Sequence, residues 1–301
     1  MSGCAGPAAR ARRLATIEAA MIQYLYLGRV DYAEALRLQE ELVELRREDR
    51  IGNVLLLLEH PPVLTLGRHA NRANVLASDE LLAARGVTLH HISRGGDVTY
   101  HGPGQLVGYP IFDLRSLERP GGGRMGPVDF VRQMEEALIG LCAVYGVRAG
   151  RIAGLTGVWI PMAGAGQEQS GRKIAAIGIH VSRGITSHGF AFNVTTDLRD
   201  FQLINPCGIT DKPVTSLDRE VADAAALPGL EAIAHQVARL FGEVFRQPAK
   251  ALESVEMLCQ ATAAGPGGEE RAPEFPAEDT PLQVPAEVER LAGNPEPPLR
   301  A

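Results

Sequence analysis

The chain has 301 residues, 45% of them hydrophobic, and a formal net charge of −6. A hydrophobic share of this size is ample for one sizeable core. Most of the negative charge lies in residues 262–301, where eight acidic side chains accompany three basic ones, so the remainder is close to neutral. A nearly neutral body argues against nucleic-acid binding by bulk electrostatics.

The cysteines and the lengths of the apolar runs indicate the cellular compartment of the protein. No stretch approaches the ~20 apolar residues of a transmembrane helix, and the arginine-rich start lacks the apolar run of a secretory signal. The four cysteines contain no C-x-x-C pair and form no disulfide framework. We therefore expect a cytoplasmic protein without a membrane segment. Residues 1–20 are interpreted as a flexible leader or an upstream start, with an organelle transit peptide as the alternative.

The first half of the chain predicts one helix and several strands. A helix is expected over residues 31–48, because Ala35, Leu38, Leu42 and Leu45 recur at helical spacing with charges on the other side. Strands are expected at residues 53–59, 63–66, 87–93 and 107–114. Pro110 in the last of these indicates an edge or an irregular position.

The second half predicts two further helices and more strands. The helices are expected over residues 127–145, ended by Gly146, and 230–245. Strands are expected at 147–152, 157–160, 174–181 and 188–193, with a polar hairpin loop between Met162 and Arg172. A short amphipathic stretch follows Pro248, and eight prolines after Thr262 predict a largely disordered tail over residues 249–301. The fold class is α/β (α+β), as one domain over residues 21–248 with mixed β-sheets.

A glycine-rich segment over residues 94–105 is a candidate binding loop. Its four glycines let backbone N–H groups approach a ligand closely, and Arg94 is suited to a carboxylate or phosphate. Thr99, Tyr100 and His101 add polar groups. A tight turn with solvated side chains is the alternative. The spacing fits neither a dinucleotide-binding fingerprint nor a P-loop.

Lys173 and Cys207 form a candidate catalytic pair. A cysteine reacts as its thiolate, and a nearby ammonium group favours that form and can transfer protons. Cys207 lies in a loop sequence, Asn-Pro-Cys-Gly, whereas Cys142 has the setting of a buried, inert thiol. Small residues at 176–178 and 189–191 suggest an apolar slot suited to an alkyl chain. The alternatives are a solvated lysine at a strand end and a second inert cysteine.

Several separated motifs agree in their order with one family. Residues 94–105 and 109–114 resemble the signature of lipoyl(octanoyl) transferases, and the runs 157–160, 172–178 and 205–208 are similar to later motifs of that family. Residues 31–39 and 188–193 fit its pattern as well. The resemblance covers roughly residues 25–245 and excludes the leader, the 163–170 loop and the tail.

The resemblance implies a fold, an activity and roles for residues. The fold is the catalytic domain shared by biotin and lipoate protein ligases. The activity is the first step of protein lipoylation in lipoate biosynthesis: octanoyl transfer from octanoyl-acyl carrier protein to a lysine of lipoyl domains of 2-oxoacid dehydrogenases or of glycine cleavage H protein. Cys207 would form the acyl thioester and Lys173 would lower its pKa. The acyl-binding residues would be Arg94, Gly95, Gly96, Asp97, Val98, Thr99, Tyr100, His101, Ala176, Ile177, Gly178, Gly189, Phe190 and Ala191.

Neither a cofactor nor a metal is expected, because a thioester donor already carries the activation energy and the histidines lack metal-ligand spacing. Two rivals stay open: an ATP-dependent lipoate or biotin ligase on the same fold, and a non-catalytic acyl-protein binder. A variant that passes octanoyl between two lipoyl-carrier proteins is a third possibility. Surface arginines near the site are candidates for guiding the carrier proteins: Arg68, Arg72, Arg172 and Arg183.

Overall fold

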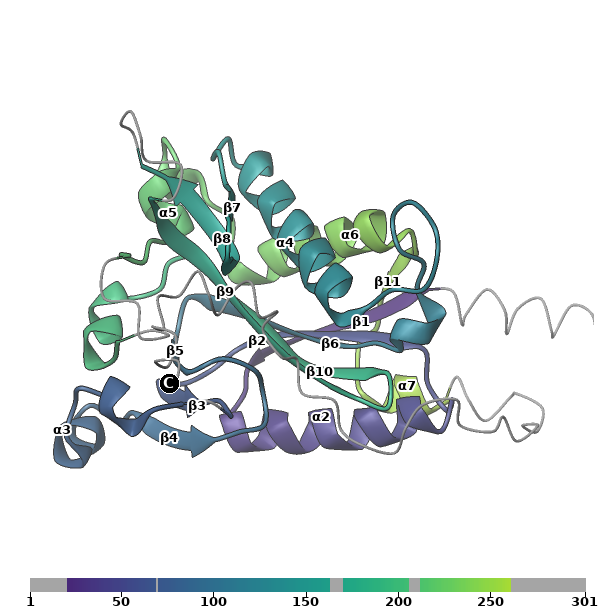
Figure 1. Cartoon of the computed structure of the whole chain (residues 1–301), viewed down its shortest axis with the longest axis horizontal. Coiled ribbons are helices and arrows are strands. Elements are labelled where there is room, and N and C mark those ends of the chain that lie inside the picture. Colours follow the sequence, from purple (N-terminus) through teal and green to yellow (C-terminus); the bar gives the residue numbers. More distant parts are fainter. Residues whose placement is uncertain (1–20, 69, 163–169, 206–211, 261–301) are drawn as a thin grey trace, which may run out of the picture.

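Two β-sheets organise the chain. The computed structural model describes residues 21–68, 70–162, 170–205 and 212–260. Its strands are β1 (Ile22–Arg29), β2 (Asn53–Glu59), β3 (Val63–Leu66), β4 (Thr88–His91), β5 (Val98–His101), β6 (Gln105–Ile111), β7 (Gly150–Ile152), β8 (Leu155–Pro161), β9 (Gly171–Ser182), β10 (Ile185–Asn193) and β11 (Ala249–Ala251). Eight strands form a large mixed sheet in the order β11-β1-β2-β6-β10-β9-β8-β7, and β4-β3-β5 form a small one (Figure 1).

Three long helices cover the large sheet. The helices are α2 (Tyr32–Arg47), α3 (Asp79–Ala84), α4 (Pro127–Val144), α5 (Leu217–Glu220), α6 (Leu230–Phe245) and α7 (Glu256–Gln260), and short 3₁₀ turns are η1 (Arg72–Asn74), η2 (Leu114–Ser116), η3 (Leu198–Leu203) and η5 (Ala224–Ala226). Helices α4 and α6 lie together on one face of the large sheet, and α2 lies on the other (Figure 1). The α/β class expected from the sequence is confirmed.

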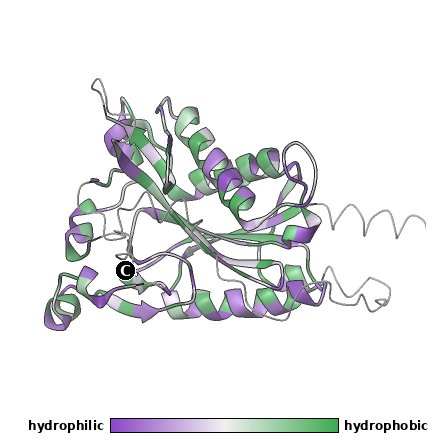
Figure 2. Ribbon diagram, in the orientation of Figure 1, coloured by the Kyte–Doolittle hydropathy of each residue, from purple (hydrophilic) through white to green (hydrophobic). Residues whose placement is uncertain are grey.

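Each layer has its own apolar cluster. The largest lies between the sheet and helices α4 and α6, and includes Phe112, Phe130 and Phe241. A second cluster lies under α2, around Leu42 and Leu56. A third packs against the small sheet and includes Leu64 and Tyr100. The helices are apolar on the sides that face the sheet and polar on the outside (Figure 2). Burial of these faces is the main stabilisation of the fold.

The long elements agree with the sequence. Helix α2 begins after Asp31, whose carboxylate accepts the N–H of Ala33 at 2.9 Å, so this residue is an N-cap. Gly146 follows α4 with φ of 71°, a conformation that suits glycine at a helix end. The sequence predicts an edge or an irregular position for Pro110, and the structure shows an irregular one. The pairing of β6 with β10 runs only from Gln105 to Gly108, so Pro110 lies beyond it.

Other elements were not predicted. Strands β1, β5 and β11 and helix α3 are absent from the sequence-based assignment, and residues 98–101 form strand β5 where a loop was expected. Packed structure continues past residue 248, because β11 pairs with β1 and Leu258 is fully buried under α2. The predicted leader, most of the 163–170 loop and the tail after residue 260 lie outside the described residues.

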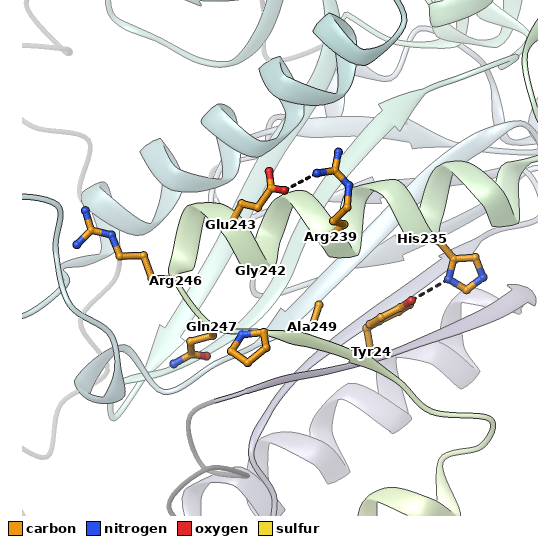
Figure 3. Close-up of a pocket in the computed structure, with 9 residues that line it drawn as sticks. Tyr24, His235, Arg239, Gly242, Glu243, Arg246, Gln247 and Ala249 are labelled. Atoms are coloured by element: carbon orange, nitrogen blue, oxygen red, sulfur yellow. Dashed lines mark hydrogen bonds and ion pairs between the residues drawn. The ribbon is translucent and has the colours of Figure 1, made fainter.

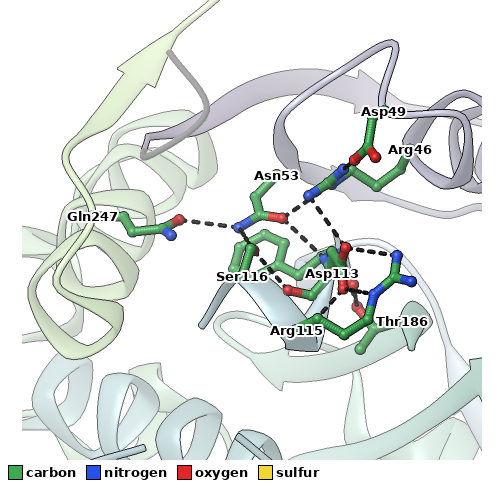
Figure 4. A network of polar contacts seen from close by, with 9 residues as sticks. Arg46, Asp49, Asn53, Asp113, Arg115, Ser116, Thr186 and Gln247 are labelled. Atoms are coloured by element: carbon green, nitrogen blue, oxygen red, sulfur yellow. Dashed lines mark hydrogen bonds and ion pairs between the residues drawn. The ribbon is translucent and has the colours of Figure 1, made fainter. Parts of the chain in front are cut away.

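A buried polar network joins α2, β2 and η2 at one end of the large sheet (Figure 4). The Asn53 side chain is its centre: its oxygen accepts the N–H of Asp113 at 3.0 Å, and its NH₂ donates to Gln247 at 3.1 Å. Arg46 donates to the same oxygen and lies 3.6 Å from the Asp113 carboxylate. Because these groups are buried and bonded, they fix the relative positions of the elements.

Candidate functional site

A small pocket lies where the small sheet meets the large one. It is lined by Thr99 of β5, Gln105 of β6, Lys173 and Ala176 of β9, Ala191 and Asn193 of β10, and Phe201 and Val214. The pocket therefore contains four of the residues predicted for the site: Thr99, Lys173, Ala176 and Ala191. Ala176 and Ala191 are directly paired between β9 and β10, so their small side chains leave space on one face of the sheet.

Lys173 lies near the start of β9 and binds the returning chain through its backbone. Its N–H donates to the carbonyl of Pro213, and its carbonyl accepts the N–H of Thr215, both at 2.9 Å. Residues 213–215 thus pair with Lys173 as a short parallel bridge. The Lys173 Nζ lies 4.6 Å from the centroid of the Trp159 ring.

The chain before Cys207 is held on the other side of the pocket. Ile204 pairs with Val75, and the N–H of Asn205 donates to the carbonyl of Asn74 at 2.7 Å. Cys207 itself lies outside the described residues, so its position beside Lys173 stays a prediction. The chain on each side of this segment contributes one residue to the pocket, Phe201 before it and Val214 after it.

A row of buried polar side chains connects His101 to this region. Gln105 donates its NH₂ to Asn193 Oδ1 at 2.9 Å and to the Tyr100 carbonyl at 3.2 Å. Its Oε1 therefore accepts from His101 Nδ1 at 2.8 Å, which assigns the proton to Nδ1 and leaves Nε2 as an acceptor. Asn193 donates to the Thr215 carbonyl at 2.9 Å. Burial, with a smaller contribution from His60, lowers the pKa of His101 to about 3, so the imidazole is neutral.

Successive side chains of β5 point to opposite sides of the small sheet, so the residues of the predicted glycine-rich segment have different surroundings. Thr99 lines the pocket, and His101 bonds to a pocket residue. Val98 and Tyr100 point the other way, into the core of the small sheet, and the Tyr100 hydroxyl donates to Asp200 at 2.8 Å. Asp97 accepts the N–H of Asn71 at 3.1 Å and also binds the Asn74 side chain.

Arg94 and the glycines after it form a bend packed on β9. The buried Arg94 guanidinium donates to the Thr65 carbonyl at 2.8 Å and to the Gly95 carbonyl at 3.0 Å. The N–H of Gly95 donates to the carbonyl of Ile179 at 3.1 Å. A Cβ at Gly178 would lie 3.0 Å from the Gly95 carbonyl, so this glycine is needed for the close approach. Gly96 has φ of 86°, which also suits glycine.

The expected apolar slot is shorter than the run of small residues. A Cβ at Gly189 would lie 2.1 Å from the Gly108 carbonyl, so β6 already fills that side. The bend at Gly95 covers Gly178 in the same way. Ile177 and Phe190 face the core under α4 and α6, where the ring of Phe190 packs on that of Phe241. Of the residues predicted for the slot at 176–178 and 189–191, only Ala176 and Ala191 therefore line the pocket.

Sequence reasoning missed two polar residues of the pocket. Gln105 and Asn193 are 1% and 4% exposed, and they stand at the first position of β6 and the last position of β10. An amide side chain at an inward-facing strand position is the signal that could have identified them, since buried amides require partners. The docking role proposed for the surface arginines stays a prediction, and the structure gives the surroundings of three of them. Arg72 pairs with Asp79, Arg172 pairs with Glu220, and Arg183 lies in the turn after β9.

A larger hollow of about 350 Å³ lies elsewhere, between α6 and the strand pair β1–β11 (Figure 3). Tyr24 binds His235 there at 2.9 Å, and Arg239 pairs with Glu243. None of the predicted site residues lines it. Within the described ranges, no helix is long and apolar enough to span a membrane, and no group of three His, Cys, Asp or Glu side chains could hold a metal.

Comparison with known proteins identifies the family. Residues 31–240 match the lipoyl protein ligase A/B catalytic domain, and the chain belongs to this family. Octanoyltransferases are among its relatives: one from Acidobacterium capsulatum is 62% identical over 78% of this chain and 94% of its own, and one from Koribacter versatilis is 51% identical over 84% and 95%. The chain is accordingly an enzyme of the acyltransferase class.

Solved structures agree on the fold. A bi-partite lipoate protein ligase from Thermoplasma acidophilum superposes with a TM-score of 0.58 at 17% identity, over 80% of this chain and 91% of that one. A lipoate-protein ligase A bound with ATP gives 0.54 at 18% identity, over 80% and 94%. The ligase-like catalytic fold expected from the sequence is thereby confirmed.

Proposed function

We propose that the protein transfers an octanoyl group from octanoyl-acyl carrier protein to a lysine of lipoyl-carrier domains, through a thioester on Cys207. The acceptors in this proposal are the lipoyl domains of 2-oxoacid dehydrogenases and the glycine cleavage H protein, in the cytoplasm. The names of the relatives support the octanoyl group. The observation that carries the proposal is Lys173, whose side chain lines the pocket while its backbone holds residues 213–215 just after the cysteine segment.

In the first step, the Cys207 thiolate attacks the carbonyl carbon of the donor thioester. The new bond joins that carbon to the Cys207 sulfur, and the bond to the carrier's pantetheine sulfur breaks. The leaving sulfur takes up a proton, which the Lys173 ammonium can supply. A lysine ammonium beside the thiol lowers the pKa of Cys207 and so favours the reactive form.

In the second step, the amine of the acceptor lysine attacks the thioester on Cys207. A C–N bond forms, the C–S bond breaks, and the cysteine leaves as its thiolate. The attacking nitrogen loses one proton, which returns to Lys173. The two half-reactions therefore balance in atoms and protons, and the energy of the donor thioester drives the formation of the amide.

Intact-protein mass measurement after incubation with octanoyl-acyl carrier protein, without ATP, tests this proposal. We expect a gain of one octanoyl group, lost in Cys207→Ala and retained in Cys142→Ala. Cys142 is a suitable control because it is fully buried in α4, and burial raises its pKa to about 12. Addition of an acceptor domain should then remove the group and leave it on the acceptor lysine.

The ATP-dependent ligases with the same fold define the competing outcome. Such an enzyme would use free octanoate and ATP and would need no cysteine. Transfer that requires ATP and persists in Cys207→Ala would overturn the transferase proposal. Absence of both reactions, in a folded protein given both donors, would favour a non-catalytic role.

A further inference from the structure

Trp159 is a buried residue that the proposed mechanism does not use. It is the only tryptophan of the chain, and it is 2% exposed. Its strand neighbours Val158 and Ile160 belong to the core under α4 and α6, but Trp159 belongs to none of the three apolar clusters. Its ring Nε1 is buried and makes no hydrogen bond among the described residues. Burial of an unpaired indole N–H costs free energy, so packing alone does not favour tryptophan over an apolar side chain at this position.

A β-bulge sets this tryptophan opposite Lys173. Val158 pairs with Ala175, and the next residue, Trp159, pairs with Lys173, so Ile174 is the extra residue on β9. Without the bulge, Trp159 would stand opposite Ile174, a fully buried core residue. Bulges redirect side chains in this way and occur often beside active sites.

Gly157 of β8 lies beside the lysine side chain and lets β8 approach the backbone of β9 closely. A Cβ at this position would lie 3.6 Å from Lys173 Cε and 2.5 Å from the Ala175 carbonyl oxygen. Gly157 has φ of 122°, and its N–H donates at 3.0 Å to Glu135, a carboxylate that is fully buried and paired with two arginines. The backbone around Trp159 is thus held from the α4 side.

The contact between the two side chains is of the cation–π kind. The distance of 4.6 Å from Nζ to the ring centroid is well inside the ~6 Å range of this interaction, and indole is its best aromatic partner. Among the described residues, no carboxylate pairs with Lys173, and the nearby Glu220 is bound to Arg172 and Thr215. An aromatic ring holds a cation without neutralising its charge, whereas a carboxylate would cancel the field that stabilises a thiolate.

We propose that Trp159 is a positioning residue for the Lys173 ammonium, which it holds at the pocket by a cation–π contact while leaving its charge available for the role that the proposed mechanism gives it toward Cys207. This role rests on the proposed function of Lys173 beside Cys207. It differs from a packing role, because it requires the aromatic face and acts only through the lysine.

The rate of alkylation of Cys207 by iodoacetamide, followed by peptide mass analysis at neutral pH, tests the proposal without any acyl donor. Trp159→Leu should slow this rate roughly two- to thirtyfold, the range that corresponds to loss of a cation–π contact. Trp159→Phe, which keeps a ring, should lie between this variant and the native protein. In a Lys173→Met background, Trp159→Leu should cause no further loss, because the residue through which it acts is gone.

Three results would overturn the role. They are an unchanged rate in Trp159→Leu, equal rates in the Leu and Phe variants, and the same loss with and without Lys173. Failure of the transferase proposal is distinguishable, since alkylation would still depend on Trp159 while octanoyl-acyl carrier protein left no acyl group on Cys207.

Emission from the single tryptophan gives a test that does not depend on replacing it. Lys173→Met should change the emission of Trp159, because it replaces a cation on the ring face by an uncharged chain of similar length. Lys250→Met, at an exposed position of β11, is the matched control and should leave the emission unchanged. Identical emission from the native protein and Lys173→Met would show that the contact is absent.

Discussion

Gln105 and Asn193 lie opposite each other on β6 and β10, and their side-chain amides share a hydrogen bond of 2.9 Å. Through Gln105 the pair fixes the ring of His101, and through Asn193 it holds the carbonyl of Thr215. The glycine-rich segment and the chain that follows the cysteine are thus joined by buried hydrogen bonds. This connection relates two motifs that lie more than 100 positions apart in the sequence.

Replacement of Asn193 by leucine should therefore destabilise the fold. Leucine has a similar shape, but it leaves the Thr215 carbonyl and one N–H of the Gln105 amide without a partner, while the other N–H keeps its bond to the Tyr100 carbonyl. Each buried group left unsatisfied costs about 1–3 kcal/mol, so the free energy of unfolding should fall by about 3 kcal/mol. Urea denaturation with linear extrapolation measures this change.

Gln236→Leu is the matched control, because Gln236 is half-buried on α6 and its side chain accepts a hydrogen bond from the exposed Arg239. Its free energy of unfolding should stay within about 0.5 kcal/mol of the native value. Similar losses of unfolding free energy in the two variants would mean that the buried amide pair stabilises the fold no more than an exposed hydrogen bond does.

The sequence predicts local features of this fold better than long-range ones. Residues 230–245 form the expected helix and residues 53–59 the expected strand, because periodicity and caps are written in neighbouring residues. Short strands such as β5 and β11 owe their existence to partners distant in the chain. The same holds for the site: the sequence predicts Lys173 as a site residue from its strand, but the proposed role of Trp159 depends on a bulge that only strand pairing creates.

Three buried histidines should make stability depend on pH. Burial lowers the pKa of His101 and His188 to about 3 and that of His60 to about 4, from the ordinary 6.5. Below pH 6.5 the histidines of the unfolded chain bind protons that those of the folded protein do not. The contribution of the neutral histidines to the free energy of unfolding is therefore complete above pH 6.5 and is lost as the pH falls towards 3. The free energy of unfolding should fall by up to about 4 kcal/mol per pH unit near pH 5.

The variant His188→Asn isolates the contribution of His188 to the pH dependence of stability. Asparagine tolerates the positive φ of 55° at this position and carries no titratable group. The slope of stability against pH between about 6 and 4 should decrease by about 1.4 kcal/mol per unit, as measured by urea denaturation at several pH values. His91→Asn, at an exposed position of β4, is the control and should keep the native slope. An unaltered slope in His188→Asn would contradict the assignment of a neutral, buried ring.

Gly157→Ala should damage the site through the backbone. The new Cβ would lie 2.5 Å from the Ala175 carbonyl, at a φ of 122° that L-residues avoid. We expect a loss of about 3 kcal/mol in the free energy of unfolding, and a loss of transfer rate as the strand pair shifts under Lys173. Gly28→Ala provides the comparison, since its φ is 64° but nothing lies within 4 Å of the added carbon. That variant should lose only about 1 kcal/mol and keep its transfer rate.

Asp97 connects the glycine-rich segment to the chain just before the cysteine. Its carboxylate binds the N–H of Asn71 and the side chain of Asn74, and the carbonyl of Asn74 binds the N–H of Asn205. The interpretation of Asp97 as a substrate-binding residue stays a prediction, and these bonds favour the alternative that Asp97 positions the chain before Cys207. Asp97→Ala should then lower kcat about tenfold or more, because small displacements of reacting groups are costly, while KM for the acyl donor changes little.

Two variants distinguish a positioning role of Asp97 from direct binding of the acyl donor. Asp97→Asn keeps an oxygen that can accept the N–H of Asn71, so it should recover part of the lost rate if the role is positional. Asp79→Ala removes a carboxylate from the same neighbourhood, where it pairs with Arg72 at an exposed position, and should leave the rate nearly native. A carboxylate that binds the acyl donor directly would instead raise KM in both Asp97 variants with kcat preserved, because only binding common to the ground state and the transition state would be lost.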